Sequence, residues 1–218
     1  MTSKHNNSRS LINFVGIPVI LSSIYIDFLF PFFVLIVMCI CSLEYVKLSN
    51  RLNSNISIII LLSFNILVYL NAIYIFFNVG HLIILFFITC FVYEMLFYSD
   101  TSTQNIASYI MGTVMIGCCL TESLINIRAL DNGLFFTLLL FFSVWICDTF
   151  AFFFGSKFGK SKILPAISPN KTWVGSLAGL SGAFLVTAVF FYLNDRYHLN
   201  VDVGLVDLFV FTIFTGVF

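Results

Sequence analysis

The sequence predicts an all-α, polytopic integral membrane protein, a helical bundle with about eight transmembrane helices. Hydrophobic residues make up 60% of the 218 positions, whereas charged residues make up only 9%. The mean hydropathy is +1.05, far outside the usual balance of soluble globular domains. The apolar residues also gather in long runs, and a helix needs about 20 of them to cross the hydrocarbon core. The formal net charge of zero gives no indication of nucleic acid as a partner.

The elements follow from the apolar runs, each bounded by polar or helix-breaking residues. The stretch 11–43 is interrupted only by Asp27 and Pro31, and we divide it there. It follows a short polar head without an obvious small-residue cleavage site, so we expect an uncleaved first span. The predicted spans are 11–26, 29–43, 56–76, 81–98, 105–123, 133–154, 172–193 and 203–218. No repeat or separate soluble domain is visible, and residues 1–218 are predicted to form one membrane domain.

The distribution of basic residues predicts a cytoplasmic N-terminus. Cytoplasmic connections carry an excess of lysine and arginine, and with the N-terminus inside, eight of the ten fall on that side. The inside residues are Lys4, Arg9, Lys47, Arg51, Lys157, Lys160, Lys162 and Lys171, and the outside ones are Arg128 and Arg196. A single span over 11–43 would put Lys47 and Arg51 opposite the head. The eight-span arrangement is therefore favoured.

Asp148 is an acidic residue inside the sixth predicted span. It stands seven residues before Gly155, hence roughly 10 Å from the cytoplasmic end at 1.5 Å per residue. An ionisable group at that depth costs about 2.5 kcal/mol or more and usually faces a polar cavity or a partner. A second interpretation stays open, in which Asp148 is an interfacial acid paired with a neighbouring lysine.

A basic segment follows this span. Residues 155–171 hold four lysines and no acid, with Pro165 and Pro169 stiffening the loop. Its stretch GSKFGKS is similar to a P-loop, but it has three residues between the glycines where four are needed, and a membrane helix precedes it in place of a strand. We expect Gly155 to end the helix and Gly159 to permit a turn.

The segment Ser168–Thr172 comes where the seventh span begins. Free backbone amides and hydroxyls at a helix start can hold a phosphate. Together with Asp148 and the lysines, this predicts a site for an anionic headgroup or a nucleotide. The basic segment can also be ordinary positive-inside flanking, and that alternative stays open.

The stretch from Asp148 to Gly175 resembles the CDP-diacylglycerol synthases, also called phosphatidate cytidylyltransferases. The matching positions are Asp148, Ala151, Phe152, Gly155, Gly159, Lys160, Ser168, Pro169, Lys171, Thr172, Trp173 and Gly175. Weaker agreement extends upstream to Arg9, Glu44, Tyr45, Arg128 and Leu130. One departure is Val174, where members of that family usually carry Glu. Another is that the chain stops before the family's C-terminal signature, which contains the acids believed to hold the metal ions.

The resemblance implies an enzyme, a nucleotidyltransferase that converts CTP and phosphatidate into CDP-diacylglycerol and pyrophosphate in phospholipid biosynthesis. It implies Mg²⁺ as cofactor, with metal ligands not identified. It assigns catalytic roles to Asp148 and Lys171, and substrate binding to Lys160, Ser168, Asn170 and Thr172. The expected partners are CTP, phosphatidate, membrane lipid and a second copy of the chain in a homodimer. The expected location is the bacterial inner (cell) membrane, with the active-site loop in the cytoplasm.

Two other functions remain open on the sequence. A CTP-dependent kinase of polyprenol or a related lipid alcohol shares features of this membrane fold. The last apolar run reaches Phe218 without a polar flank, although a natural C-terminus usually leaves the bilayer before it stops. We therefore expect a truncated chain without the family's C-terminal catalytic segment, or an inactive polytopic remnant. A transporter is disfavoured, because its polar groups would lie near the bilayer midplane.

Overall fold

The computed structural model describes residues 16–165, 168–197, 201 and 204–217. The chain forms two compact units, residues 1–131 and residues 132–218. The single membrane domain over residues 1–218 stays a prediction. Five described helices are long and apolar enough to cross a membrane. The prediction of an all-α polytopic membrane protein is confirmed.

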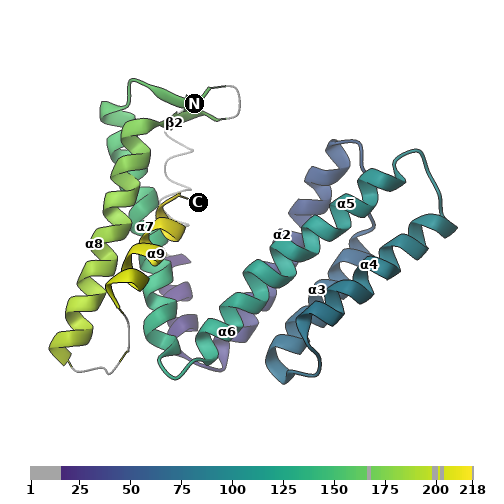
Figure 1. Cartoon of the computed structure of the whole chain (residues 1–218), viewed down its shortest axis with the longest axis horizontal. Coiled ribbons are helices and arrows are strands. Elements are labelled where there is room, and N and C mark those ends of the chain that lie inside the picture. Colours follow the sequence, from purple (N-terminus) through teal and green to yellow (C-terminus); the bar gives the residue numbers. More distant parts are fainter. Residues whose placement is uncertain (1–15, 166–167, 198–200, 202–203, 218) are drawn as a thin grey trace. The chain divides into compact units, whose positions relative to one another are not determined.

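The first unit consists of helices (Figure 1). They are the helix Gly16–Tyr25, α2 (Leu29–Arg51), α3 (Ile58–Tyr74), α4 (Val79–Leu96), α5 (Ser102–Gly112), the π-helix η1 (Thr113–Glu122) and α6 (Ser123–Ala129). The last three form one continuous helix, Ser102–Ala129. The wide turn of η1 is visible in its side chains, since the hydroxyls of Thr121 and Ser123 donate to carbonyls five residues earlier.

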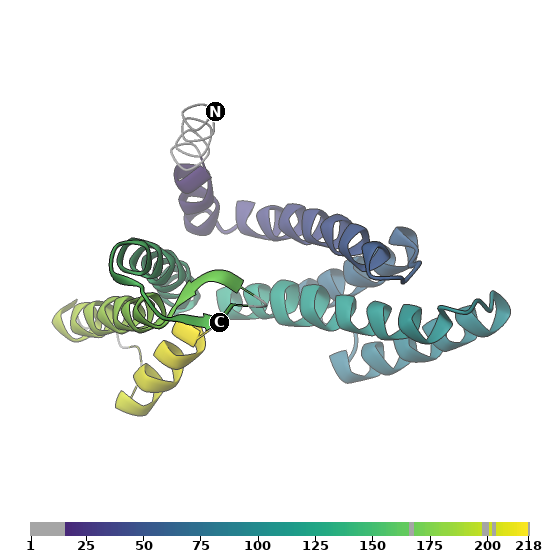
Figure 2. The same cartoon turned by 90° about the horizontal axis from the view of Figure 1, so that it is seen from above.

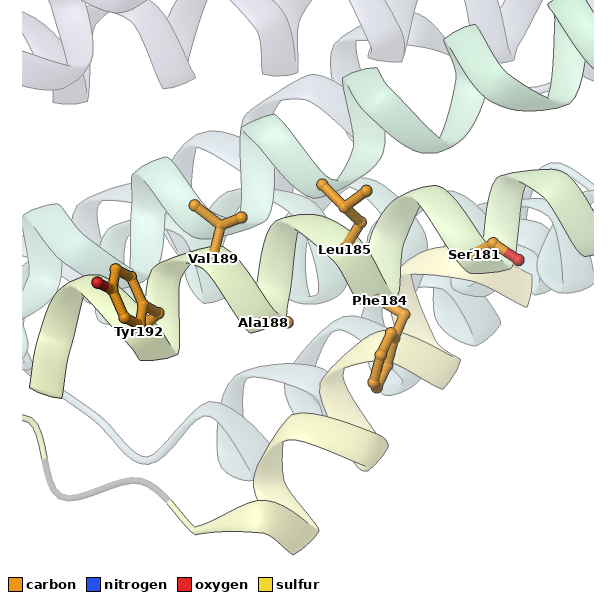
Figure 3. A pocket seen from close by; sticks show the side chains of 6 residues that line it. All are labelled: Ser181, Phe184, Leu185, Ala188, Val189 and Tyr192. Atoms are coloured by element: carbon orange, nitrogen blue, oxygen red, sulfur yellow. The ribbon is translucent and has the colours of Figure 1, made fainter.

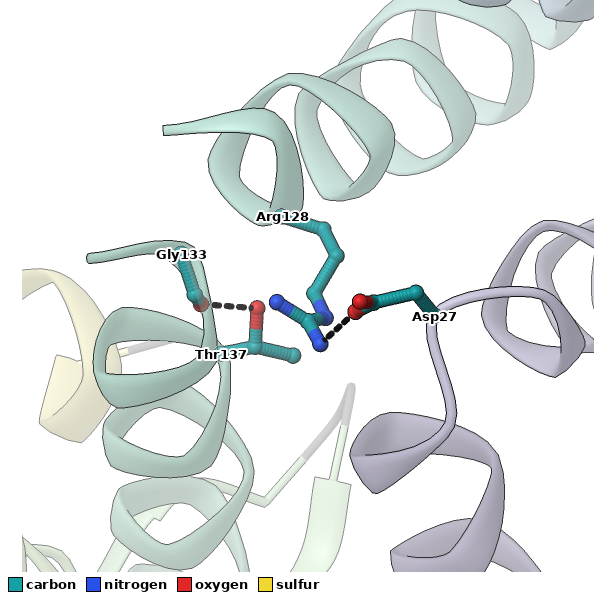
Figure 4. Close-up of polar contacts among 4 residues, drawn as sticks. All are labelled: Asp27, Arg128, Gly133 and Thr137. Carbon is teal, nitrogen blue, oxygen red and sulfur yellow. Dashed lines mark hydrogen bonds and ion pairs between the residues drawn. The ribbon is translucent and has the colours of Figure 1, made fainter. Parts of the chain in front are cut away.

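Polar side chains close the connections of this unit. Between α3 and α4, the Asn71 side chain accepts from the backbone N–H of Phe77 and donates to its carbonyl. Asn78 then caps α4, because its Oδ1 accepts from the Gly80 amide at 2.9 Å. Asp27, in the break before α2, accepts from the Arg128 guanidinium at the end of α6 (Figure 4). The Asn71 contacts, the Asn78 cap and the Asp27–Arg128 ion pair thus stabilise the connections where these helices begin and end.

The interior of the first unit combines an apolar cluster with buried polar groups. The cluster contains Val46, Ile56, Leu61, Phe86, Cys90 and Tyr109. The fully buried Asn65 donates to the Ser42 hydroxyl at 3.0 Å, and the Tyr109 hydroxyl accepts from the backbone amide of Ser57 at 2.6 Å. Such polar contacts join helices where lipid provides no hydrophobic driving force between them.

The described residues of the second unit form three helices and a small hairpin. They are α7 (Gly133–Phe158), β1 (Lys162–Leu164), β2 (Ser168–Thr172), α8 (Trp173–Tyr197) and α9 (Leu205–Val217). The strands are antiparallel, with Lys162 opposite Thr172 and Leu164 opposite Ser168. Helices α7 and α8 run side by side in both views (Figures 1 and 2). Near the start of α7 the Thr137 hydroxyl donates to the Gly133 carbonyl at 2.7 Å (Figure 4).

Small residues let α7 and α8 approach closely. A Cβ atom added at Gly175 would lie 2.8 Å from the Ala151 carbonyl oxygen, and one at Gly179 would lie 3.0 Å from the Cys147 sulfur. Glycine at these positions therefore sets the spacing of the two backbones, as it does in many membrane helix pairs.

Each of the eight predicted spans overlaps a helix of the structure, although positions 11–15, 203 and 218 lie outside the described residues. The expectation that Gly155 ends its helix is wrong, because α7 continues to Phe158 and Gly159 is the capping residue. Gly159 has φ −77° and ψ 100°, so it does not use the left-handed conformation that favours glycine in turns. The hairpin was not predicted.

Candidate active site

A cavity of about 530 Å³ opens in the second unit, between α7, the hairpin and α8, with one residue from α9. Its lining residues are Cys147, Asp148, Ala151, Phe152, Gly155, Ser156, Gly159, Lys162, Ile163, Asn170, Lys171, Thr172, Gly175, Ser176, Gly179 and Gly216. The stretch from Asp148 to Gly175 thus supplies most of the wall of this one cavity.

Helical spacing explains which residues face the cavity. On α7 the lining positions Asp148, Ala151 and Gly155 are three and four residues apart, which places them on one side of the helix. On α8, Gly175 and Gly179 have the same spacing and face α7. The glycines keep this side free of bulk, so Asp148 borders open space in place of packed side chains.

Thr172 holds the corner where β2 becomes α8. Its side chain is only 3% exposed, and its hydroxyl oxygen accepts from the Gly175 amide at 3.1 Å. This is the bond of a helix N-cap to the third helical residue. Cβ atoms added at Gly155 or Gly175 would each lie 3.1 Å from the same hydroxyl oxygen. The predicted substrate-binding Thr172 thus also has a structural role, because glycines pack around it.

The amides at the start of α8 are partly used inside the protein. The Trp173 amide donates to the Ser161 carbonyl at 3.2 Å, and the Gly175 amide donates to Thr172. The expectation that the helix start offers its free amides to a phosphate is therefore wrong for two of the first three residues. Other donors at the cavity have to come from side chains.

The structure brings together four of the six predicted site residues. Asp148, Asn170, Lys171 and Thr172 all line the cavity. Lys160 and Ser168, predicted to bind substrate, are not among its described lining residues.

Four chemically capable lining residues were not predicted from the sequence, namely Lys162, Cys147, Ser156 and Ser176. Ser176 has a signal in the sequence, since it follows Thr172 by one helical turn. Cys147 directly precedes Asp148, and we interpreted it as a packing residue. For Lys162 the sequence shows only one of several lysines in a segment without acids.

The charges on the cavity wall are two lysines and one aspartate, namely Lys162, Lys171 and Asp148. Within the part of the chain that the structure describes, the only ion pair is Asp27–Arg128 in the first unit. The three charged groups of the wall therefore make no ion pair with described residues. By contrast, the Lys157 ammonium lies 5.8 and 5.4 Å from the ring centroids of Phe153 and Phe158, a cation–π arrangement.

A set of metal ligands is only partly present. Among the described residues there is no group of three or more His, Cys, Asp or Glu side chains placed to hold a metal ion. Asp148 is the one carboxylate in the described cavity wall. Mg²⁺ commonly binds through one or two carboxylates together with waters and substrate phosphates, and a wall with one carboxylate fits that mode.

A second, open groove of about 480 Å³ runs along α8. Figure 3 shows its six lining residues, Ser181, Phe184, Leu185, Ala188, Val189 and Tyr192, all on this one helix. None of them is charged, and an exposed apolar helix side is the expected surface toward lipid tails in a membrane protein. We therefore interpret the groove as part of the lipid-facing side of α8.

Comparison with known proteins matches this chain to the model of the cytidylyltransferase family over residues 7–218. Its curated relatives include proteins named phosphatidate cytidylyltransferase. That of Staphylococcus haemolyticus is 39% identical over 84 residues, which is 38% of this chain and 32% of the relative. That of Haemophilus influenzae is 39% identical over 65 residues, 30% of this chain and 23% of the relative. That of Chlamydia trachomatis is 44% identical over 59 residues, which is 27% of this chain and 19% of the relative. The chain thus matches a third or less of each relative's length.

Proposed function

The chain belongs to the cytidylyltransferase family, and on this premise we propose that it acts in the cytidylyl transfer from CTP to phosphatidate. The products are CDP-diacylglycerol and pyrophosphate, and the reaction serves phospholipid biosynthesis. The observation that carries the proposal is the cavity of the second unit, where Asp148 of α7 meets Lys171 and Asn170 of the hairpin. The names of the relatives support the choice of phosphatidate.

The proposed reaction needs no covalent enzyme intermediate. A phosphate oxygen of phosphatidate attacks the α-phosphorus of CTP, the bond from that phosphorus to the bridging oxygen breaks, and pyrophosphate leaves with the electron pair. Lys171 would stabilise negative charge on the phosphates, and Asn170 and Ser176 would donate hydrogen bonds that orient them. Catalysis by position and electrostatics suits a wall that carries cations and hydroxyls.

Mg²⁺ is the cofactor that we propose for this site. Asp148 would hold it together with the phosphate oxygens of the substrates, because Mg²⁺ prefers oxygen ligands. When bound, the ion would neutralise phosphate charge and polarise the reacting phosphorus. Asp148 would then serve to place positive charge deep in the cavity.

The protein is an integral membrane protein, as its five long apolar helices indicate. We propose the bacterial inner membrane, with the hairpin on the cytoplasmic side, because bacterial relatives and the excess of basic residues in this connection support that placement. CTP would reach the cavity from the cytoplasm and phosphatidate from the bilayer. The homodimer stays a prediction.

The test compares two lysines of the same segment. Lys171 lines the cavity, whereas Lys157 lies over aromatic rings and outside the lining. We expect Lys171→Ala, in the chain reconstituted into lipid nanodiscs, to weaken the binding of labelled CTP by roughly tenfold or more, as the loss of a hydrogen bond to a charged group predicts. Lys157→Ala should bind CTP nearly as the wild type does. Equal effects of the two variants would remove Lys171 from the site.

Turnover distinguishes this activity from a lipid kinase. With CTP labelled on the α-phosphate, cytidylyl transfer moves the label into the lipid fraction, whereas a CTP-dependent kinase moves only a label on the γ-phosphate. Phosphatidate and dolichol are offered side by side in the same nanodiscs. Label from the γ-phosphate in dolichol, with none from the α-phosphate in phosphatidate, would refute the proposed function.

A further inference from the structure

An anion bound in the cavity of the second unit would have to be held mainly by side-chain groups. Among the first three amides of α8, those of Trp173 and Gly175 already bind Ser161 and Thr172. The Thr172 hydroxyl oxygen, in turn, is buried and accepts the Gly175 amide. A helix start that is partnered in this way gives little to a phosphate, although helix starts commonly bind one.

Two lysines stand at the hairpin side of the cavity, one on each strand. Lys162 of β1 is paired across the sheet with Thr172, and Lys171 is the neighbour of Thr172 on β2. Neighbouring residues on one strand point to opposite faces of a sheet, so the strand pairing alone does not bring the two lysine side chains together, and what unites them is their place in the wall of one cavity of about 530 Å³. Both residues line the cavity.

The surroundings leave these two ammonium groups available. The described hairpin residues, 162–165 and 168–172, include no acid. In the described chain neither lysine makes an ion pair. A lysine acts as a compact positive charge with three donors and is a common phosphate ligand.

We propose that Lys162 contacts phosphate in this cavity as the partner of Lys171, and that the sequence-predicted Lys160 does not. This inference rests on the proposed function and assigns a further binding residue to it. Lys160 lies between the end of α7 and the start of β1, outside the described lining. Lys160 and Lys162 are two positions apart and carry the same charge, so they form a matched pair for mutation.

The experiment uses the whole chain in lipid nanodiscs and three probes, namely labelled CTP, pyrophosphate and short-chain phosphatidate. We expect Lys162→Ala to weaken the binding of CTP or of phosphatidate by roughly tenfold or more. Lys160→Ala should change each by less than about threefold, since Lys160 does not belong to the described lining of the cavity. The probe that responds identifies whether the phosphate comes from the nucleotide or from the lipid headgroup.

Lys162→Arg controls for folding, because it keeps the charge and should retain most of the binding that Lys162→Ala loses. If Lys160→Ala weakens binding as much as Lys162→Ala, or if neither variant changes it, the assignment of Lys162 is wrong while the proposed function stands. If the wild-type chain binds none of the three probes, the proposed function and the role of Lys162 both fail.

Discussion

Gly159 is the position where the structure makes its sharpest prediction. It caps the end of α7 beside the cavity. A Cβ atom there would collide with the Gly155 carbonyl oxygen and the Thr172 hydroxyl oxygen, and would lie 2.6 Å from the Thr172 methyl carbon. The backbone conformation of Gly159 is open to any residue, so Gly159→Ala tests the available space alone.

The expected loss of stability in Gly159→Ala follows from the crowding around the added Cβ atom. Ordinary contact begins at 3.4 Å, so the Thr172 methyl group alone would have to retreat by about 0.8 Å. Thr172 is 3% exposed and holds the start of α8, and the Gly155 oxygen belongs to the backbone. Overpacking of this kind costs about 1–3 kcal/mol. We expect the upper part of that range, which is a decrease of roughly 4–12 °C in Tm for a chain of this size.

The assay is thermal unfolding of the purified chain in detergent micelles, followed by CTP binding at 25 °C. Gly204→Ala is the matched control in the same unit, because a Cβ atom at Gly204 would meet its nearest neighbour at an ordinary 3.4 Å. We expect that control to keep its Tm within about 2 °C. A Gly159→Ala protein with the Tm and the CTP affinity of the wild type would refute the packing of Gly159 against Thr172.

Two further predictions concern the first unit. Ile75 caps the end of α3 with φ 52° and is 81% exposed, so Ile75→Gly should raise the free energy of unfolding by about 1 kcal/mol. Ile73→Gly, inside the same helix, is the control and should lower the free energy of unfolding by about 1 kcal/mol. Equal effects of the two variants in thermal unfolding would contradict the strain at Ile75. Tyr109→Phe removes the acceptor of the hydrogen bond from the Ser57 amide and should lower the free energy of unfolding by about 1–3 kcal/mol. Slower amide hydrogen exchange at Ser57 in this variant would contradict the role of that hydrogen bond.

The membrane spans could be predicted from the sequence because one physical quantity sets them. A helix that crosses the hydrocarbon core has to cover it with apolar residues, so the apolar runs show where the helices lie, whereas only five of the described helices are long and apolar enough to cross a membrane. The finer limits depend on packing. A Cβ atom added at Gly155 would lie 3.2 Å from the Cα atom of Gly175, so this glycine serves the close packing of α7 on α8 and does not end its helix, and no local signal in the sequence announces that contact.

The hairpin was not predictable from local sequence. Its strands contain three and five residues, too short to show an alternation of apolar and polar positions. Pro165 and Pro169 also argue against strands. The pairing of Lys162 with Thr172 joins two segments of the hairpin, and local sequence does not announce it. The sequence therefore indicates the segment that lines the cavity, but it points to Lys160, whereas the described lining contains Lys162.

The departure from the family pattern at Val174 takes a different meaning in the structure. Members of the family that the sequence resembles usually carry Glu at this position. Val174 is 38% exposed and does not belong to the described lining, whereas its neighbours Thr172, Gly175 and Ser176 do. Since successive helical residues point about 100° apart, a side chain at position 174 of this chain is directed away from the cavity. The valine thus leaves the charged groups of the described wall, two lysines and Asp148, unchanged.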